Sequence, residues 1–358
     1  MDLQELLDQI WPGWEIVDKI GEGSFGVVYE ARRQDLSGVT RSAIKAVVIP
    51  RSESELDALY SEGMGPSQTH TYLENIVKDY SREIRLMESV KGHSNIVSIE
   101  DHAICEHKDK TAWHIFIRME LLTPLTKYVA LNGISEKGIV KLGMDMCRAL
   151  SVCADRHIIH RDIKPENIFI NEMGNYKLGD FGVARKLEQT TMGFTRTGAL
   201  NYMAQEVYND AIGDMNFEDA SRADIYSLGL VMYCLANGSR LPFLPQGKTI
   251  LSLEDRKNAF ARRIHGDALP PPTGQISERL CRIILKACAY DPKGRYSSVR
   301  EMLQALEELE RSPTASVTPA VNNDAQSCDN RSKQDVSEEQ KGDSRKKPGK
   351  CCCWRSCR

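Results

Sequence analysis

The stretch IIHRDIKPENIFI, residues 158–170, places an imidazole, a guanidinium, a carboxylate, an ammonium and an amide within eight positions, between two apolar segments. Asp162 offers a carboxylate that can accept a proton, and Lys164 offers an ammonium that can neutralise negative charge. Asn167 adds an amide oxygen, a hard ligand suited to Mg²⁺. Transfer of a phosphoryl group to a hydroxyl needs this set, because catalysis there is positioning of the hydroxyl plus neutralisation of charge.

A second candidate metal ligand follows in KLGDFGVAR, residues 177–185. Asp180 provides a carboxylate, and the apolar Phe181 beside it can anchor the segment in a core. Asn167 and Asp180 together are the oxygen donors from which a Mg²⁺ site can be built.

The stretch IGEGSFGVVYEA, residues 20–31, places Gly21, Gly23 and Gly26 at the G-x-G-x-x-G spacing. Such glycines also occur in plain hairpin turns, so the spacing alone is a weak signal. A dinucleotide site would need a helix directly after the glycines. The continuation VVYEA instead predicts a strand, so we expect a strand-turn-strand loop whose backbone N–H groups can cover phosphates.

Lys45 lies nineteen residues after Gly26, between apolar neighbours in SAIK. Its ammonium could extend to the surface along the apolar stem of the side chain. Alternatively it points into a cleft and pairs with phosphate oxygens, which requires an anionic partner when the site is empty. Glu83, in SREIRLMESV, is the candidate partner.

The elements that must position these residues change character along the chain. Short strands are expected within 14–49, near 96–104 and at 113–119, because these segments alternate and are rich in β-branched residues. Residues 50–68 are polar and contain Gly63, Gly65 and Pro66, which predicts a loop, and helical periodicity follows from about 71 to 90. Helical signals dominate beyond residue 126. This order predicts a small strand-rich lobe, a larger helical lobe and a cleft between them.

The composition is that of an ordinary globular protein, with 41% hydrophobic and 27% charged residues in 358. A net charge of −3 gives no sign of nucleic-acid binding. The N-terminus lacks the regions of a signal peptide, and the longest apolar run, at 228–236, is too short to cross a bilayer. The six cysteines of the body show no repeating spacing, so we expect reduced thiols and a cytoplasmic protein.

The glycine hairpin, the strand lysine, H-R-D-x-K-x-x-x-N and D-F-G occur in that order, and together they resemble the eukaryotic-type (Hanks-type) serine/threonine protein kinase family. The resemblance covers about residues 14–310 and implies an α+β, two-lobed fold. The lobes would be an antiparallel, β-rich N-lobe at about 14–122 and a mainly α-helical C-lobe at about 123–310. Residues 1–13 would be an extension, and 311–358 a disordered basic, Cys-rich tail. ATP and Mg²⁺, with Mn²⁺ as an alternative ion, are the implied cofactors, and serine or threonine hydroxyls of proteins the acceptors.

The resemblance also implies roles for the polar residues of the two central motifs. Asp162 would be the catalytic base, and Lys164 would neutralise charge on the transferring phosphoryl group. Asn167 and Asp180 would hold magnesium. Lysine at position 164 is the serine/threonine-type pattern. Asp224 matches the residue that anchors the catalytic loop in the family.

For the nucleotide, the resemblance implies that Lys45 binds the α- and β-phosphates and that Glu83 holds Lys45. Met119 stands at the gatekeeper position of the hinge. The other implied ATP-binding residues are Ile20, Gly21, Gly23, Gly26, Val28, Ala43, Glu120, Leu122 and Phe169. Glu120 and Leu122 would meet the adenine edge through their backbones, and the apolar members would cover its faces. Ordinary core packing is the alternative for the apolar members.

Regulation is implied by the loop KLEQTTMGFTRTG, residues 186–198, and by Arg161. Thr195 stands eleven residues before Glu206, the spacing at which an activating phosphothreonine often occurs in the family. Arg161 could dock that phosphate, and autophosphorylation of the segment is expected. The threonines of this polar loop could equally be solvated residues without that role.

The chain departs from the family where GALNYMAQE replaces the usual G-T-x-x-Y-x-A-P-E. Ala199 replaces a threonine whose hydroxyl usually bridges the catalytic aspartate and lysine, and Gln205 replaces the proline. Losing one hydrogen bond costs about 0.5–1.5 kcal/mol, so we expect weaker catalysis or relaxed substrate docking and not loss of activity. Glu206 remains, with Arg295 as its expected partner.

The C-terminal SRKKPGKCCCWRSCR contains six basic residues and four cysteines. It could be a solvated basic tail. It could also contact a membrane surface, because basic residues beside acylatable cysteines supply two attachment signals. A zinc site is a third alternative, although the tail has no histidine.

Two other functions remain open for a chain of this pattern. A kinase-like binding module without activity would usually lack Lys45, Asp162 or Asp180, and all three are present. A small-molecule phosphotransferase of related fold would usually lack a long activation segment, which here runs from Asp180 to Glu206.

Overall fold

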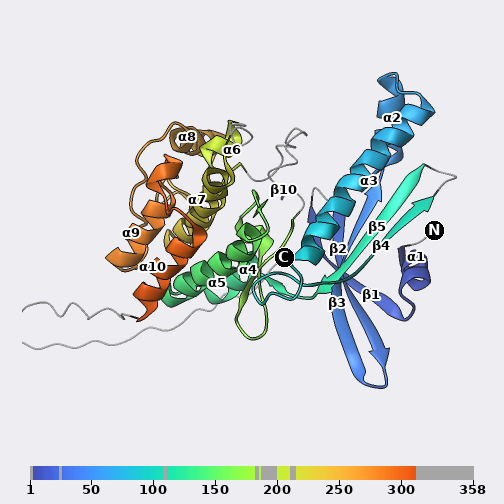
Figure 1. Cartoon of the computed structure of the whole chain (residues 1–358), viewed down its shortest axis with the longest axis horizontal. Coiled ribbons are helices and arrows are strands. Elements are labelled where there is room, and N and C mark those ends of the chain that lie inside the picture. Colours follow the sequence, from blue (N-terminus) through green and yellow to red (C-terminus); the bar gives the residue numbers. More distant parts are fainter. Residues whose placement is uncertain are drawn as a thin grey trace, which may run out of the picture. The chain divides into compact units, whose positions relative to one another are not determined.

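The computed structural model describes residues 3–23, 26–107, 111–181, 185–186, 200–209 and 215–311. These residues belong to one unit, 1–314, of the two into which the chain divides. Strands dominate up to residue 120 and helices after it, which confirms the α+β prediction (Figure 1).

The N-terminal part is built on one antiparallel sheet of five strands in the order β1-β2-β3-β5-β4. The strands are β1 Trp14–Gly23, β2 Gly26–Asp35, β3 Gly38–Ile49, β4 Ile99–His107 and β5 Ala112–Glu120. Side chains alternate between the two faces of a strand, so neighbours such as Lys45 and Ala46 serve opposite faces.

Both faces of this sheet are covered. Helix α3 (Pro66–Ser89) packs on one face, where Val47, Ile115 and Ile117 join the main hydrophobic core. Helix α1 (Leu3–Ile10) belongs to a second cluster, with residues of the other face such as Ile44. Its end is fixed by Trp11, whose indole Nε1 donates to Asp101 Oδ2 at 2.7 Å. The N-terminal extension is therefore packed on the sheet.

The segment between β3 and Glu83 differs from the predicted loop at 50–68. Residues Glu53–Ser61 form helix α2, capped by Ser52, and α3 already begins at Pro66 (Figure 1). The prediction of a loop was wrong over 53–61, where Ser52 caps a helix, and over 66–68, where Gly65 and Pro66 begin a helix instead of interrupting one. Proline fits the first helical position, since its missing N–H would have no partner there. Gly65 N also donates to Gln68 Oε1 at 3.0 Å.

The C-terminal part is a cluster of helices around α5 (Glu136–Ala154) and α7 (Phe217–Ala236), whose side chains are mostly buried (Figure 1). The surrounding helices are α4 Leu125–Asn132, α6 Gln205–Tyr208, α8 Leu253–Ile264, α9 Glu278–Ala287 and α10 Val299–Arg311. The apolar run at 228–236 lies in α7 and is core. In the described part of the chain, no helix has the length and apolar character that a membrane crossing requires.

Short strands hold the central motifs. Strand β6, Thr123–Pro124, directly precedes α4, and the others lie between α5 and α7: β7 Ile158–Ile159, β8 Ile168–Ile170, β9 Tyr176–Leu178 and β10 Arg185–Lys186. Strands β6, β8 and β9 form one small sheet, and β7 pairs with β10. Residues 160–167, which end in the 3-10 turn η1 (Pro165–Asn167), therefore span the gap between β7 and β8. A second 3-10 turn, η4 (Pro292–Gly294), precedes α10.

The six body cysteines are free thiols, as predicted. Four of them are buried among apolar side chains: Cys147, Cys153, Cys234 and Cys288. Burial raises the pKa of the Cys153 and Cys288 thiols to about 12, so both stay protonated and unreactive near neutral pH.

Candidate active site

A cavity of about 580 Å³ lies between the five-stranded sheet and the short strands of the helical part. The expected site residues that line it are Ile20, Gly21, Gly26, Val28, Ala43, Lys45, Glu83, Met119, Glu120, Leu122, Lys164, Asn167, Phe169 and Asp180. Asp162 is not itself a lining residue, but it accepts hydrogen bonds from two of them, Lys164 and Asn167. The sequence patterns therefore converge on one cleft.

Lys45 points into the cleft and not to the surface. Its Nζ lies 3.2 Å from Glu83 Oε1 and 3.4 Å from Asp180 Oδ1, and its side chain is only 12% exposed. Burial by itself lowers the pKa of an ammonium, but the nearby carboxylates of Asp180 and Glu83 outweigh it. The pKa of Lys45 is therefore held above its usual value, and the side chain stays charged at neutral pH.

The polar residues between β7 and β8 form a small hydrogen-bonded network around Asp162. Asp162 Oδ2 accepts from Lys164 Nζ at 2.7 Å and from Asn167 Nδ2 at 2.9 Å. Asn167 Nδ2 also donates to the Asp162 carbonyl at 2.8 Å. Asp162 Oδ1 is buried and has no hydrogen-bond partner within the described residues. A buried carboxylate oxygen with unused acceptor capacity suits the removal of a proton from a hydroxyl.

Asp224 of α7 fixes the start of this loop. Its carboxylate accepts from the backbone N–H groups of His160 and Arg161, both at 2.8 Å. Burial raises the pKa of Asp224, while those two hydrogen bonds act in the opposite direction. Arg161 has a φ of 66°, in the left-handed region that non-glycine residues rarely adopt. The anchored backbone therefore holds a turn that costs about 1–3 kcal/mol.

Asn167 and Asp180 are brought together by the backbone, because Gly179 N donates to the Asn167 carbonyl at 2.9 Å. The Asn167 amide nitrogen is used on Asp162, which leaves its oxygen for a ligand. No cluster of three or more His, Cys, Asp or Glu side chains suited to a metal occurs in the described ranges. One carboxylate and one amide oxygen fit a divalent ion that takes its other ligands from phosphates and water.

The glycine loop is a hairpin between β1 and β2, as the continuation VVYEA predicts, with Gly23 opposite Gly26. Gly26 has a φ of +126°, and a Cβ there would lie 2.5 Å from the Ala46 carbonyl oxygen. Any other residue would push the hairpin away from β3 and Lys45. Glycine is therefore required at this position by both conformation and close approach.

The hinge segment after β5 is fixed through the side chain of Glu120. Glu120 Oε1 accepts from Lys177 Nζ at 2.7 Å and from Ser98 N at 2.6 Å. This tie holds the backbone of residues 120–122 at the cavity wall. The sequence reading did not name Lys177, which lies in β9, 57 positions from Glu120.

Other lining residues that the sequence reading missed include Val97, Ile117, Thr126 and Glu166. Ile117 could have been found once β3 and β5 were paired, because it lies opposite Lys45 in that register. Glu166 stands inside the quoted motif, between Lys164 and Asn167.

The end of the activation segment is tied to the loop before α10. Arg295 and Glu206 form the expected buried ion pair, with Nη1–Oε1 at 2.5 Å and Nη2–Oε2 at 3.1 Å. Gln205, in the place of the usual proline, joins this pair: its Oε1 accepts from Arg295 Nη2 at 3.4 Å, and its Nε2 donates to the Tyr290 carbonyl. Thr195, Ala199 and the C-terminal tail from residue 312 lie outside the described residues.

Comparison with known proteins agrees with this geometry. A family model described as the protein kinase domain matches residues 14–307. A probable serine/threonine-protein kinase of Clostridium perfringens, CPE1738, is 26% identical over 85% of this chain and 39% of its own length. Serine/threonine-protein kinase PrkC of Bacillus subtilis is 31% identical over 63% of this chain and 33% of its own length. CBL-interacting protein kinase 21 of Oryza sativa is 30% identical over 72% of this chain and 42% of its own length.

The chain belongs to the protein kinase domain family. It spans about a third to two fifths of the length of these two bacterial relatives. A protein kinase domain implies use of ATP and, in general, of a divalent metal ion.

Proposed function

We propose that this chain is a serine/threonine protein kinase that transfers the γ-phosphoryl group of ATP to protein hydroxyls with Mg²⁺, residues 14–310 being its catalytic domain. The observation that carries the proposal is the position of Lys45 between the carboxylates of Glu83 and Asp180 in the wall of the cleft. A buried ammonium held by two acidic groups from different parts of the chain suits binding of phosphate oxygens.

In this proposal Asp162 accepts the proton of the attacking serine or threonine hydroxyl through Oδ1, its unused oxygen. Lys164, already 2.7 Å from Asp162, neutralises charge on the transferring group. Asn167 and Asp180 hold Mg²⁺, which supplies further neutralisation of phosphate charge when bound. The acceleration then comes from positioning and electrostatics, as expected for phosphoryl transfer.

The nucleotide is bound through the remaining cleft residues. Lys45 meets the α- and β-phosphates, and the hairpin of Gly21, Gly23 and Gly26 covers them. The adenine edge meets the backbones of Glu120 and Leu122. Four apolar side chains cover its faces, three from the sheet and one from β8: Ile20, Val28, Ala43 and Phe169. The cavity is large enough for a nucleotide, since ligand sites usually measure about 300–1,000 Å³.

Two regulatory features complete the proposal and rest on the sequence alone. Autophosphorylation at Thr195 would add charge that Arg161 could dock. The basic, Cys-rich C-terminus would contact a membrane surface if its cysteines are acylated.

The test is transfer of labelled γ-phosphate from Mg-ATP to the chain itself and to a mixed histone preparation. We expect transfer by the wild-type chain and none above background by Asp162→Asn, with Asp155→Asn as the control at an exposed aspartate. Mass spectrometry of residues 186–198 checks Thr195. Nucleotide binding without any transfer would overturn the proposal in favour of a kinase-like binding module.

A further inference from the structure

Arg263 of α8 is a buried cation that holds the backbone of the segment after the activation loop. It is only 4% exposed. Its Nη2 donates to the Leu200 carbonyl at 2.7 Å, and its Nη1 donates to the Met203 carbonyl at 2.6 Å. Nη1 also lies 3.3 Å from the hydroxyl of Tyr226. One guanidinium therefore joins two points of a segment that lies about sixty positions away in the sequence.

Carbonyl oxygens and aromatic rings surround the Arg263 guanidinium in the described part of the chain. Among the residues that the structure describes, no carboxylate lies within ion-pair distance of it. Its guanidinium lies 5.3 Å from the ring centroid of Phe260 and 5.9 Å from that of Tyr226. Burying a charge in this way is costly, so its position calls for a geometric reason. A planar fork with several donors can hold two carbonyls at once, whereas a lysine ammonium is a single point charge.

The neighbouring residue shows the contrast. Arg262 pairs with Asp267 at 2.7 Å, and its side chain is 55% exposed. Within the described residues, Arg262 makes no hydrogen bond or ion pair with the segment 200–206. The two arginines have identical side chains, but adjacent residues of a helix point in different directions, about 100° apart. Arg262 therefore forms an ion pair at the surface, whereas Arg263 is buried against the segment 200–203.

Both ends of the segment 200–206 are held in this manner. Arg263 binds Leu200 and Met203, and Arg295 binds Gln205 and Glu206. Tyr226 contacts both guanidinium groups, since Arg295 lies 4.7 Å from the centroid of its ring. The segment is therefore fixed by two arginines that share one aromatic residue of α7.

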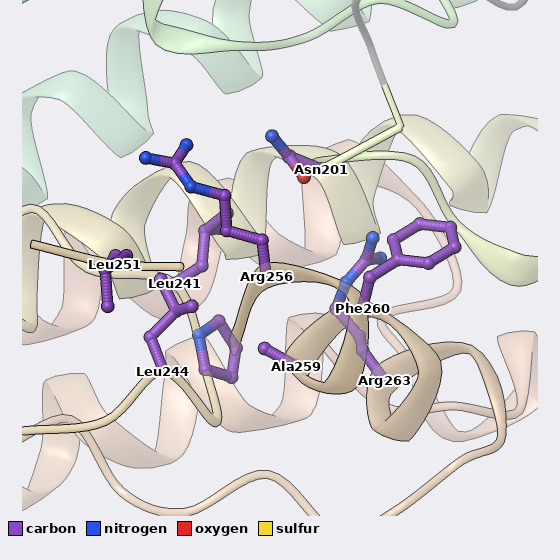
Figure 2. A pocket seen from close by; sticks show the side chains of 9 residues that line it. Asn201, Leu241, Leu244, Leu251, Arg256, Ala259, Phe260 and Arg263 are labelled. Atoms are coloured by element: carbon purple, nitrogen blue, oxygen red, sulfur yellow. The ribbon is translucent and has the colours of Figure 1, made fainter. Parts of the chain in front are cut away.

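Between this segment and α8 lies a pocket of about 60 Å³. Figure 2 shows Asn201 and Arg256 on one side of it, with Phe260 and Arg263 together on another. Arg263 thus belongs both to the clamp and to the wall of a pocket that includes a residue of the segment.

We propose that Arg263 is a positioning residue that sets the segment 200–203 for docking of the polypeptide substrate. The proposal rests on the proposed kinase function, because docking is defined by that reaction. It gives a reason for tolerating the departures at Ala199 and Gln205: backbone anchoring from α8 replaces part of the order that the missing threonine and proline would supply. Arg263 does not line the nucleotide cavity, so its effect should be confined to the acceptor.

The experiment compares Arg263→Met, Arg263→Lys and the control Arg262→Met in the full chain. Hydrogen exchange of peptides covering 200–209 reports the clamp directly and needs no activity. Phosphoryl transfer to mixed histones and ATP hydrolysis by water, both with Mg-ATP, report docking and nucleotide chemistry separately. Thermal unfolding shows whether each variant folds.

We expect faster exchange at 200–209 in both Arg263 variants, with exchange in α5 unchanged. We also expect kcat/KM for histones to fall about 10- to 100-fold, mainly through KM, because loss of positioning costs rates of this order. The rate of ATP hydrolysis and the KM for ATP should stay within about twofold, and Arg262→Met should match the wild type.

Three outcomes overturn the inference. Unchanged exchange at 200–209 in Arg263→Met would show that the arginine does not order the segment. Equal loss of histone transfer and ATP hydrolysis would show a general structural role. Full activity of Arg263→Lys would show that charge, and not the two-carbonyl fork, is what matters. A wild-type chain that transfers no phosphate would instead remove the proposed function, while the exchange data would still decide whether the clamp exists.

Discussion

The loop at 160–167 and the segment 200–206 are both held in a fixed conformation, but by different kinds of contact. In the loop, the residues that the family pattern requires are all present. Asp162 accepts hydrogen bonds from Lys164 and Asn167, and Asp224 accepts hydrogen bonds from the backbone of residues 160 and 161. In the segment, Gln205 stands in place of the usual proline, and order comes from arginines of other elements. Proton and phosphoryl transfer need particular atoms, whereas docking needs only a fixed backbone, which several side chains can provide.

The largest effect is expected at Asp162. Asp162→Asn should lower phosphoryl transfer by about 10²–10⁴-fold, because a general base contributes about that much. The free energy of unfolding should change little, since asparagine keeps the shape. Steady-state kinetics with Mg-ATP and mixed histones measures the first quantity, and thermal unfolding the second. Retained activity would remove the distinction between the two regions, because neither would then need particular atoms.

The buried pair at the end of the segment should be the most costly to stability. Arg295→Met leaves Glu206 buried without its partner, so we expect a loss of about 3–5 kcal/mol in the free energy of unfolding. Urea unfolding of the variant against the wild type measures it. The double variant Arg295→Met/Glu206→Leu should recover part of the loss, since it leaves no unpaired charge. No recovery would mean that the contacts of Arg295 with Gln205 and Tyr226 dominate instead.

The anchor of the catalytic loop offers a sharper comparison. Asp224→Asn replaces one of two acceptors for the N–H groups of His160 and Arg161, so one buried donor loses its partner. We expect a loss of about 1–3 kcal/mol in stability. Transfer to histones and ATP hydrolysis should fall together, because the loop serves both reactions. Measuring the two rates side by side checks this, and a selective loss of histone transfer would contradict the assigned role.

The smallest effect is expected at Gln205. Gln205→Ala removes the hydrogen bonds to Arg295 and to the Tyr290 carbonyl, and should cost about 0.5–1.5 kcal/mol in stability. Gln205→Pro restores the family residue and shows whether proline at this position can replace them. Thermal unfolding and histone KM are the measurements. A loss as large as that of Arg295→Met would show that Gln205, and not the ion pair, organises this region.

Much of the fold followed from local patterns. The strands of the sheet, the long helix that carries Glu83 and the order of the two lobes could be predicted, because alternation and helical periodicity are properties of neighbouring residues. Helix α2 was missed, since its boundaries depend on Ser52 as a cap and on Leu59 finding a buried site. The packing of α1 on the sheet was missed for a similar reason: the partners of Trp11 lie in strands far along the chain.

The sequence by itself indicated phosphoryl transfer as the class of chemistry. Asp162, Lys164 and Asn167 lie within six positions and supply the carboxylate, ammonium and amide that this reaction uses. It also gave Glu83 as the candidate partner of Lys45, a pairing that the resemblance to the kinase family implies. Only the tertiary structure decided between Arg262 and Arg263. The two are adjacent and chemically identical, and what separates them is the direction of each on α8 relative to a backbone sixty positions away. Such a contact has no local signature, because burial and hydrogen-bond geometry arise only when distant elements pack together.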